Sequence, residues 1–242
     1  AASDVYKRQD KNQSFDVINP ARGDTVAQVA NLSREQISAA IDSAYEAQKE
    51  WAKNTGKERA SILRRWFDLM MENSEDLAKI LTAEQGKPLS ESKGEIAYGA
   101  SFIEFFAEEA KRVYGEIIPG HQKDKRIMVF KQPIGVAASI TPWNFPLHQI
   151  IGKVAPALAA GCTMVLKPSK EAPLNAFILA DIIDEIGLPD GVFNLVSGHG
   201  REIGETLSSH PEVDMVSFTG STGAGISVSQ AAAPTVKRVT LE

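Results

Sequence analysis

Residues 134–146, Ile-Gly-Val-Ala-Ala-Ser-Ile-Thr-Pro-Trp-Asn-Phe-Pro, decide the fold of this chain. An apolar run short enough for a buried strand comes first, and prolines then separate it from a helical pattern within 147–160. The same order of strand, turn and helix recurs to the last residue. We expect further strands at 162–166, 192–196, 215–218 and 238–241, and helices at 173–186, 201–208 and 222–232. Repeated units of this kind predict a doubly wound α/β domain on a parallel sheet.

The residues that directly follow these strands are expected to form the ligand site, because parallel sheets bind ligands at the carboxyl ends of their strands. They are Thr141–Pro146, Lys167–Lys170, Gly198–Gly204 and Gly220–Gly225. Two of these turns are rich in glycine, which lets the backbone approach a ligand, and a helix N-terminus behind such a turn attracts phosphate. Each turn alone is equally well explained as a tight connection. The four together, with Lys167 as a fixed positive charge, indicate a dinucleotide site.

The composition argues against several classes of function. The 242 residues are 43% hydrophobic, which is enough to bury a core. Their net charge is −5, which argues against nucleic-acid binding because that function favours a basic face. No run approaches the ~18 consecutive apolar residues of a membrane span. The single cysteine, Cys162, allows no internal disulfide and indicates a reducing compartment, so we expect a cytoplasmic location. The histidines, His121, His148, His199 and His210, lack metal-ligand spacing, so we expect no metal.

The first 132 residues are organised differently. Residues 1–9 lack the apolar core of a secretory signal and are interpreted as foreign sequence, such as a cloning scar or a translated adapter. Residues 10–114, with two short strands followed by long helices, are expected to join 133–242 in one dinucleotide-binding domain. The last of these helices is expected at 90–114. Between the two parts, strands expected at 115–118 and 126–132 flank a loop and predict a projecting hairpin.

Four motifs in series resemble the aldehyde dehydrogenase superfamily. They are Thr141-Pro-Trp-Asn-Phe-Pro146, Gly161-Cys-Thr-Met-Val-Leu-Lys-Pro168, Phe218-Thr-Gly-Ser-Thr222 and Val239-Thr-Leu-Glu242. Their order and spacing are similar to that family over residues 15–242. The resemblance implies a Rossmann-like domain, NADP or NAD as cofactor, and oxidation of an aldehyde substrate to a carboxylic acid through a cysteine thioester. It also implies a parent protein that forms a homodimer or homotetramer through the hairpin 115–132.

The resemblance also assigns roles to single residues. Asn144 resembles the amide that stabilises the oxyanion of the tetrahedral intermediate, a task that suits a neutral N–H donor. Glu242 resembles the general base that activates water to hydrolyse the thioester, and a partly desolvated carboxylate at the sheet edge would suit that task. Lys167 resembles the lysine that holds the adenosine ribose. The residues expected at the cofactor are Thr141, Pro142, Trp143, Asn144, Lys167, Pro168, Ser169, Lys170, Gly200, Gly204, Phe218, Gly220 and Ser221.

Cys162 is the only thiol and has to be considered as the nucleophile. It begins an apolar strand and therefore lies at the end opposite the expected site, where a buried thiol is inert. In the family, the nucleophile follows the base by a few dozen positions, and this chain stops on Glu242 in the middle of a predicted strand. We therefore expect a chain cut at that point, without the catalytic domain that carries the cysteine. The alternative function is that of a non-catalytic dinucleotide-binding fragment.

Two positions depart from the family pattern. Lys170 stands where the family often has a glutamate that binds the ribose hydroxyls, so a cation there favours NADP, although Glu171 follows directly. Residues 60–126 resemble succinate-semialdehyde dehydrogenase, yet Gly152 stands where that branch has an arginine for the substrate carboxylate. Residues 147–152 are more similar to general aldehyde dehydrogenases. A mosaic of two genes and a divergent natural enzyme both explain the combination.

Overall fold

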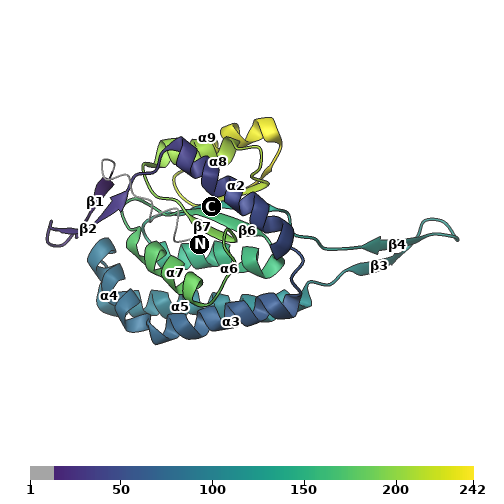
Figure 1. Ribbon diagram of the computed structural model, residues 1–242, viewed down its shortest axis with the longest axis horizontal. Helices are drawn as coiled ribbons and strands as arrows, with labels where there is room; N and C mark the ends of the chain where they lie inside the picture. Colours follow the sequence, from purple (N-terminus) through teal and green to yellow (C-terminus); the bar gives the residue numbers. More distant parts are fainter. Residues whose placement is uncertain (1–13) are drawn as a thin grey trace.

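The computed structural model of this protein describes residues 14–242, and Figure 1 shows its layers. The interpretation of residues 1–9 as foreign sequence therefore lies outside the described residues. A five-stranded parallel sheet has the order β7-β6-β5-β8-β9. Its strands are β5 (Val136–Ile140), β6 (Thr163–Lys167), β7 (Phe193–Leu195), β8 (Met215–Phe218) and β9 (Arg238–Leu241). The predicted doubly wound parallel sheet is confirmed, with β8 and β9 at their expected bounds.

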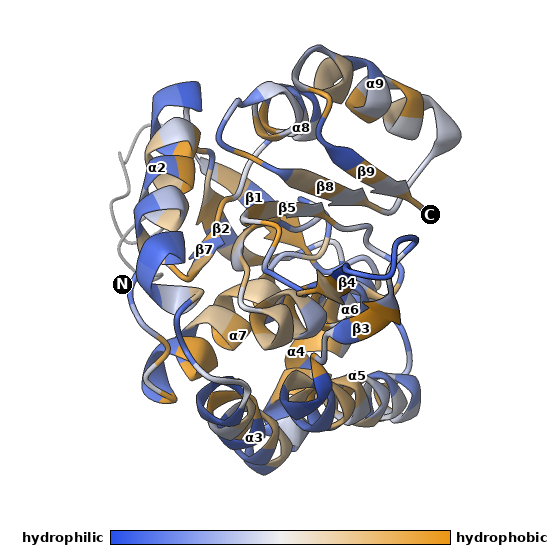
Figure 2. Ribbon diagram, turned by 90° about the vertical axis from the view of Figure 1, so that its right-hand side faces the viewer, coloured by the Kyte–Doolittle hydropathy of each residue, from blue (hydrophilic) through white to orange (hydrophobic). Residues whose placement is uncertain are grey.

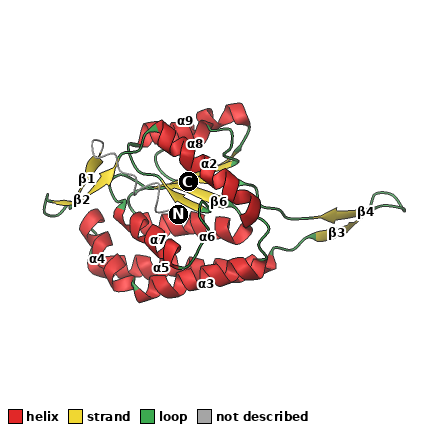
Figure 3. Cartoon of the chain, viewed as in Figure 1, coloured by secondary structure: helices red, strands yellow, loops and turns green. Residues whose placement is uncertain are grey.

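Helices cover both faces of the sheet (Figure 3). One face carries α2 (Arg34–Trp51), α8 (Gly200–Ser209) and α9 (Thr222–Ala232). The other face carries α6 (Pro146–Ala160) and α7 (Leu174–Glu185), and behind them α3 (Gly56–Glu72), α4 (Ser74–Gln85) and α5 (Leu89–Glu109). Two short 3-10 helices, η1 (Ala110–Arg112) and η2 (Ala233–Thr235), follow α5 and α9.

Local sequence signals explain where several helices begin and end. Capping boxes open two of them, because Ser33 and Gln36 exchange side-chain and backbone hydrogen bonds before α2, and Thr55 and Glu58 do the same before α3. Pro146 is the first residue of α6, where its missing N–H is no loss. Gly161 ends α6 at φ +88°, a left-handed conformation that favours glycine.

The core consists of two clusters, one on each face of the sheet. Strands β5 and β6 are buried along their whole length, as expected for strands covered on both faces. Figure 2 shows the apolar residues on the sheet and on the inward sides of the helices, while outer surfaces such as that of α3 are hydrophilic. The outermost strand β9 is mostly exposed.

Two antiparallel pairs lie outside the central sheet. The first is formed by β1 (Ser14–Ile18) and β2 (Thr25–Ala30). The second, formed by β3 (Glu116–Pro119) and β4 (Arg126–Val129), projects from the body as the predicted hairpin (Figure 1). The expected helix 90–114 already ends at Glu109, and the expected strand 126–132 ends at Val129, because these segments leave the body and run exposed to solvent. Within residues 14–242, no helix has the length and apolar character needed to cross a membrane.

Candidate functional site

The strand order brings the predicted site residues to one edge of the sheet. From β5 the chain first proceeds to β6 and β7 on one side, and then crosses to β8 and β9 on the other. The reversal lies between β5 and β8, and ligands bind at the carboxyl ends of the strands at such a point. Hydrogen bonds fix the turns there: Thr141 N donates to Lys167 O at 3.1 Å, and Thr219 N donates to Ile140 O at 3.1 Å.

A groove of about 740 Å³ opens at this reversal, between α8 and α9 and above the ends of β5 and β8. That volume lies in the range of small-molecule and cofactor sites. Three residues predicted at the cofactor, Gly200, Gly204 and Phe218, line it. The lining residues are Ile140, Gly200, Arg201, Gly204, Glu205, Phe218, Ala224, Ser227, Val228, Gln230 and Ala231.

Glycine is required at two of the turns for different reasons. Gly198 has φ +142°, and a Cβ there would stand 2.3 Å from Asn31 Oδ1, which accepts a hydrogen bond from His199 N at 3.0 Å. At Gly220 a Cβ would stand 2.6 Å from Cζ of Phe218. The absent side chains therefore let both turns pack closely beside the groove.

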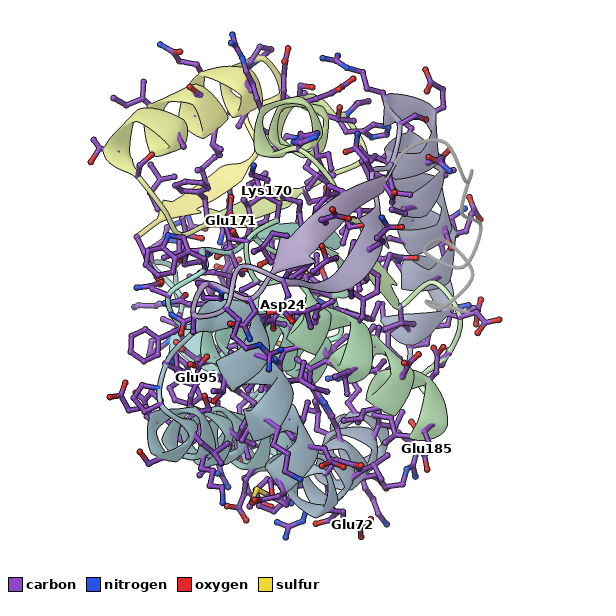
Figure 4. The ribbon with its side chains drawn as sticks, turned by 90° about the vertical axis from the view of Figure 1, so that its left-hand side faces the viewer. Asp24, Glu72, Glu95, Lys170, Glu171 and Glu185 are labelled. Atoms are coloured by element: carbon purple, nitrogen blue, oxygen red, sulfur yellow. The ribbon has the colours of Figure 1, made fainter. Side chains whose placement is uncertain are left out.

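The two lysines that follow β6 occupy different environments. Lys167 is only 4% exposed, and its Nζ donates to Pro168 O at 2.8 Å. Burial, assisted by the nearby charge of Lys170, lowers the pKa of Lys167 to about 8, which leaves the side chain mostly protonated at pH 7. Lys170 is exposed and lies 3.4 Å from a carboxylate oxygen of Glu171, and Figure 4 shows the two side by side.

The carboxylate of Glu242 lies at the same edge, directly after β9. Glu242 Oε2 accepts a hydrogen bond from Thr219 Oγ1 at 2.9 Å and lies 3.5 Å from Nζ of Lys153. The Thr219 hydrogen bond, followed by the Lys153 charge, lowers the pKa of Glu242 despite slight desolvation. The side chain is 63% exposed, so the carboxylate is desolvated only slightly, and its proposed role stays a prediction.

Lys153 was not among the residues that the sequence indicated. It projects from α6, and its side chain is only 7% exposed although its ammonium faces Glu242. The sequence does hold a signal, because Lys153 is the only lysine, arginine or acidic residue in a helix that is otherwise apolar or neutral. A single charge in such a helix requires a partner or a function.

Asn144 lies in the turn between β5 and α6, and a hydrogen bond from a neighbouring lysine contacts this turn. The carbonyl oxygen of Asn144 accepts a hydrogen bond from Lys87 Nζ at 2.9 Å. Trp143 is 55% exposed, and the part of the chain that the structure describes does not place it or Pro142 on the groove. The structure thus brings the predicted residues to one edge but divides them between the groove and this turn.

Cys162 lies at the amino-terminal ends of the strands, opposite the candidate site. It immediately precedes β6, is 4% exposed, and burial raises the pKa of its thiol. A thiol of this kind is seldom present as the reactive thiolate. Its position and environment both argue against a role as the nucleophile.

These features define an α/β domain of the doubly wound class, with a groove and a row of polar side chains at the carboxyl ends of its strands. The chain belongs to the aldehyde dehydrogenase family, whose family model matches residues 6–242. The predicted family is confirmed.

Several known proteins are similar to this chain. Succinate-semialdehyde dehydrogenase (NADP+) of Escherichia coli is 54% identical over 230 residues, which are 95% of this chain and 48% of that protein. Glutarate-semialdehyde dehydrogenase of Pseudomonas aeruginosa is 53% identical over 96% of this chain and 48% of its own length. Among solved structures, betaine aldehyde dehydrogenase of Staphylococcus aureus in complex with NAD+ has a TM-score of 0.94 at 36% identity, over 97% of this chain and 47% of that one.

The chain thus spans about half the length of the curated relatives it matches. The two explanations of the mixed subfamily features, a mosaic of two genes and a divergent natural enzyme, both stay predictions.

Proposed function

We propose that this chain binds NADP or NAD at the carboxyl edge of its sheet and forms the cofactor-binding part of an enzyme that oxidises an aldehyde to a carboxylic acid. The observation that carries the proposal is the groove at the β5–β8 reversal, which has Gly200, Gly204 and Phe218 in its wall and Glu242 on the same edge. The named activities of the relatives support it. When bound, the nicotinamide would supply the acceptor for hydride.

The proposed cofactor residues divide by position. Gly200, Gly204 and Phe218 line the groove, with Gly220 and Ser221 following directly after β8, and this group would hold the adenine and pyrophosphate. Lys167 and Lys170, with Pro168 and Ser169 between them, would hold the adenosine ribose, and the exposed ammonium of Lys170, which is paired with Glu171 at 3.4 Å, favours the 2′-phosphate of NADP. Thr141, Pro142, Trp143 and Asn144 would line the other end of the site.

Two residues are proposed to act on the substrate. The side-chain amide of Asn144 would donate to the oxyanion of the tetrahedral intermediate. Glu242 would take a proton from water as the water oxygen bonds to the thioester carbonyl carbon and the carbon–sulfur bond breaks. The lowered pKa of Glu242 keeps it ionised near neutral pH, which this step requires. Because Cys162 is buried at the wrong edge, the thiol must come from outside these 242 residues.

The alternative function, dinucleotide binding without catalysis, is favoured for the 242 residues on their own by the position of Cys162. Calorimetry of the chain with NADP+ and with NAD+ tests the binding that both functions share. We expect one saturable site, lost in Ser227→Trp, which fills the groove, and kept in Ile226→Trp, whose side chain is exposed outside it. No binding of either nucleotide would overturn the proposal.

A chimera tests the catalytic part of the proposal. In this chimera, the Escherichia coli relative's sequence beyond the matched region follows Glu242. We expect aldehyde-dependent production of NADPH from the chimera and none from the 242 residues. Glu242→Gln should leave a burst of reduced cofactor followed by a stalled steady state, because the thioester forms but is not hydrolysed. An unchanged steady-state rate would refute the role of Glu242.

The substrate carboxylate is a separate question. The relatives' names favour succinate semialdehyde, whereas Gly152 offers no cation, and a carboxylate left unpaired in a closed site is costly. A Cβ at Gly152 would meet open space, so Gly152→Arg can be accommodated. In the chimera we expect neutral aldehydes to be oxidised at least as well as succinate semialdehyde, with Gly152→Arg shifting selectivity towards the latter. A strong preference for succinate semialdehyde before the substitution would refute this.

The hairpin of β3 and β4 is proposed to join subunits of a homodimer or homotetramer. Its apolar side chains stand in solvent, with Ile117 77%, Met128 63% and Phe130 75% exposed. Large apolar side chains gathered on a projecting element mark an interaction surface. Sedimentation of the chimera should show an assembly that Ile117→Lys with Met128→Lys dissociates.

A further inference from the structure

A buried ion pair lies at the junction of α4 and α5. Lys87 Nζ stands 2.5 Å from Glu95 Oε2, and the two side chains are 8% and 0% exposed. Removing two charges from water is costly, and a buried pair is by itself a weak source of stability. The other contacts of the pair therefore matter more than the pair itself.

Those contacts converge on the turn that carries Asn144. Lys87 Nζ donates to the carbonyl oxygen of Asn144 at 2.9 Å, and it lies 4.3 Å from the centre of the Phe145 ring. The other carboxylate oxygen of Glu95, Oε1, accepts from Leu147 N at 3.0 Å and from His148 N at 3.1 Å, the first turn of α6. The pair thus holds the backbone on both sides of Phe145.

The side chain of Asn144 is left free by the same arrangement. Asn144 is exposed, and within residues 14–242 its side-chain amide makes no hydrogen bond, while its carbonyl also lies 3.4 Å from Gln85 Nε2. A donor that must meet a developing oxyanion acts best when its backbone is fixed and its N–H is unengaged. A displacement of about 1 Å at such a group can cost about a hundredfold in rate.

We propose that Lys87 and Glu95 are positioning residues, which fix the backbone of Asn144 so that its amide meets the reacting oxygen. This inference rests on the proposed oxyanion role of Asn144. Neither residue touches the substrate in this proposal. Lys87 acts through the Asn144 carbonyl, and Glu95 acts through Lys87 and the N-terminus of α6.

Hydrogen exchange of the 242-residue chain tests the clamp without any catalysis. In Lys87→Met we expect the amides of Leu147, His148 and Gln149, whose hydrogen bonds go to Glu95 and to the carbonyl of Phe145 in this turn, to exchange at least tenfold faster, with β8 and β9 unchanged. Lys87→Arg should restore part of the protection. Lys79→Met is the matched control, because Lys79 is an exposed lysine of α4 whose ion pair with Asp76 faces solvent. An unchanged turn, or an equal rise throughout the chain, would overturn the proposal.

A mutant cycle in the chimera tests the link to chemistry. Lys87→Met should lower kcat at least tenfold with KM changed less than threefold, and should lower it no further in the Asn144→Ala background. An equal loss in both backgrounds would overturn the proposal, because Lys87 would then not act through Asn144. If Asn144→Ala alone leaves kcat unchanged, the oxyanion role fails, and with it this inference as a statement about catalysis. The exchange data then decide the clamp alone.

Discussion

Two strand-to-helix turns of this domain are built alike but stabilised differently. The β5–α6 turn carries Asn144, and the β6–α7 turn carries Lys170. Each leads into a helix whose first amides donate to a buried glutamate from another layer. Glu95 accepts from Leu147 N and His148 N at the start of α6, and Glu84 accepts from Leu174 N at 2.6 Å and Asn175 N at 3.0 Å at the start of α7.

The two buried glutamates differ in whether a cation is paired with them. Glu95 pairs with Lys87, whereas Glu84 has no ion pair within residues 14–242 and instead accepts a further hydrogen bond from Asn175 Nδ2 at 2.8 Å. Burial therefore raises the pKa of Glu84 to about 7. A buried carboxylate can thus cap a helix either as a paired anion or as a group that is half neutral near pH 7. The paired form is found beside Asn144.

The largest difference should appear when each carboxylate is removed. Glu95→Ala leaves the Lys87 ammonium buried without an anion and should lower the free energy of unfolding by about 3–5 kcal/mol. Glu84→Ala removes only hydrogen bonds and should lower it by about 1–3 kcal/mol. Urea unfolding at pH 7 measures both, with Glu91→Ala on the exposed side of α5 as control. Equal losses would show that Lys87 makes no difference.

The second largest difference between the two turns is expected in how stability depends on pH. Because the pKa of Glu84 is raised from 4.5 to about 7, the folded chain keeps a proton that the unfolded chain releases. The stability contributed by this group is therefore present below about pH 4.5 and is lost as pH rises through 7, by about 3 kcal/mol. The free energy of unfolding is measured at pH 4.5 and at pH 8 for Glu84→Gln and for the unsubstituted chain. Only the unsubstituted chain should lose this stability at pH 8. A parallel pH dependence of the two would contradict it.

Cofactor preference should respond at the β6–α7 turn only. Lys170→Glu replaces a cation near the proposed 2′-phosphate by an anion, and should lower the ratio of NADP+ to NAD+ affinity by about tenfold to a hundredfold, or about 1–3 kcal/mol. Calorimetry with each nucleotide measures the ratio. Lys57→Glu, at an exposed position of α3, is the control for net charge. A constant ratio would mean that Lys170 points away from the ribose.

The smallest expected effect on stability concerns two glycines, one in α6 and one directly after α7. Gly152 lies inside α6, where an added Cβ meets open space, so Gly152→Ala should raise stability by about 0.5–1 kcal/mol. Gly187 follows α7 at φ +77°, and although its Cβ would also meet open space, Gly187→Ala should lower stability by about 1 kcal/mol. Thermal unfolding of both variants gives the two signs. The same sign for both would refute the backbone argument.

The sequence predicted most of the fold because the apolar pattern repeats cleanly in its second half. Helix α9 and strands β8 and β9 have the bounds that the pattern indicated. The ends of α5 and β4 were placed less well. Both segments lead to or lie in the projecting hairpin, where packing against the body no longer supports regular structure.

The polar framework of the site was much less visible in the sequence. Glu84 in α4, Glu95 in α5 and Lys87 between the two helices occur among other charged residues, where a charge normally faces solvent. Their partners lie 52 to 91 positions away in α6 and α7, so no local spacing reveals them. The burial of Lys167 likewise depends on neighbours distant in the chain, so no local sequence pattern indicated it.

The position of β5 between β6 and β8 also sets an order of assembly in time. Ala137 pairs with Met164, 27 positions later, and with Met215, 78 positions later. Closing the longer loop costs more entropy, and non-local parallel pairing is slow. During synthesis, the ribosome releases β6 and β7 before β8, so we expect β5, β6 and β7 to fold with α6 and α7 first. The groove, which needs β8 and α9, is then the last part to form, and added nucleotide should slow unfolding without speeding the early folding phase.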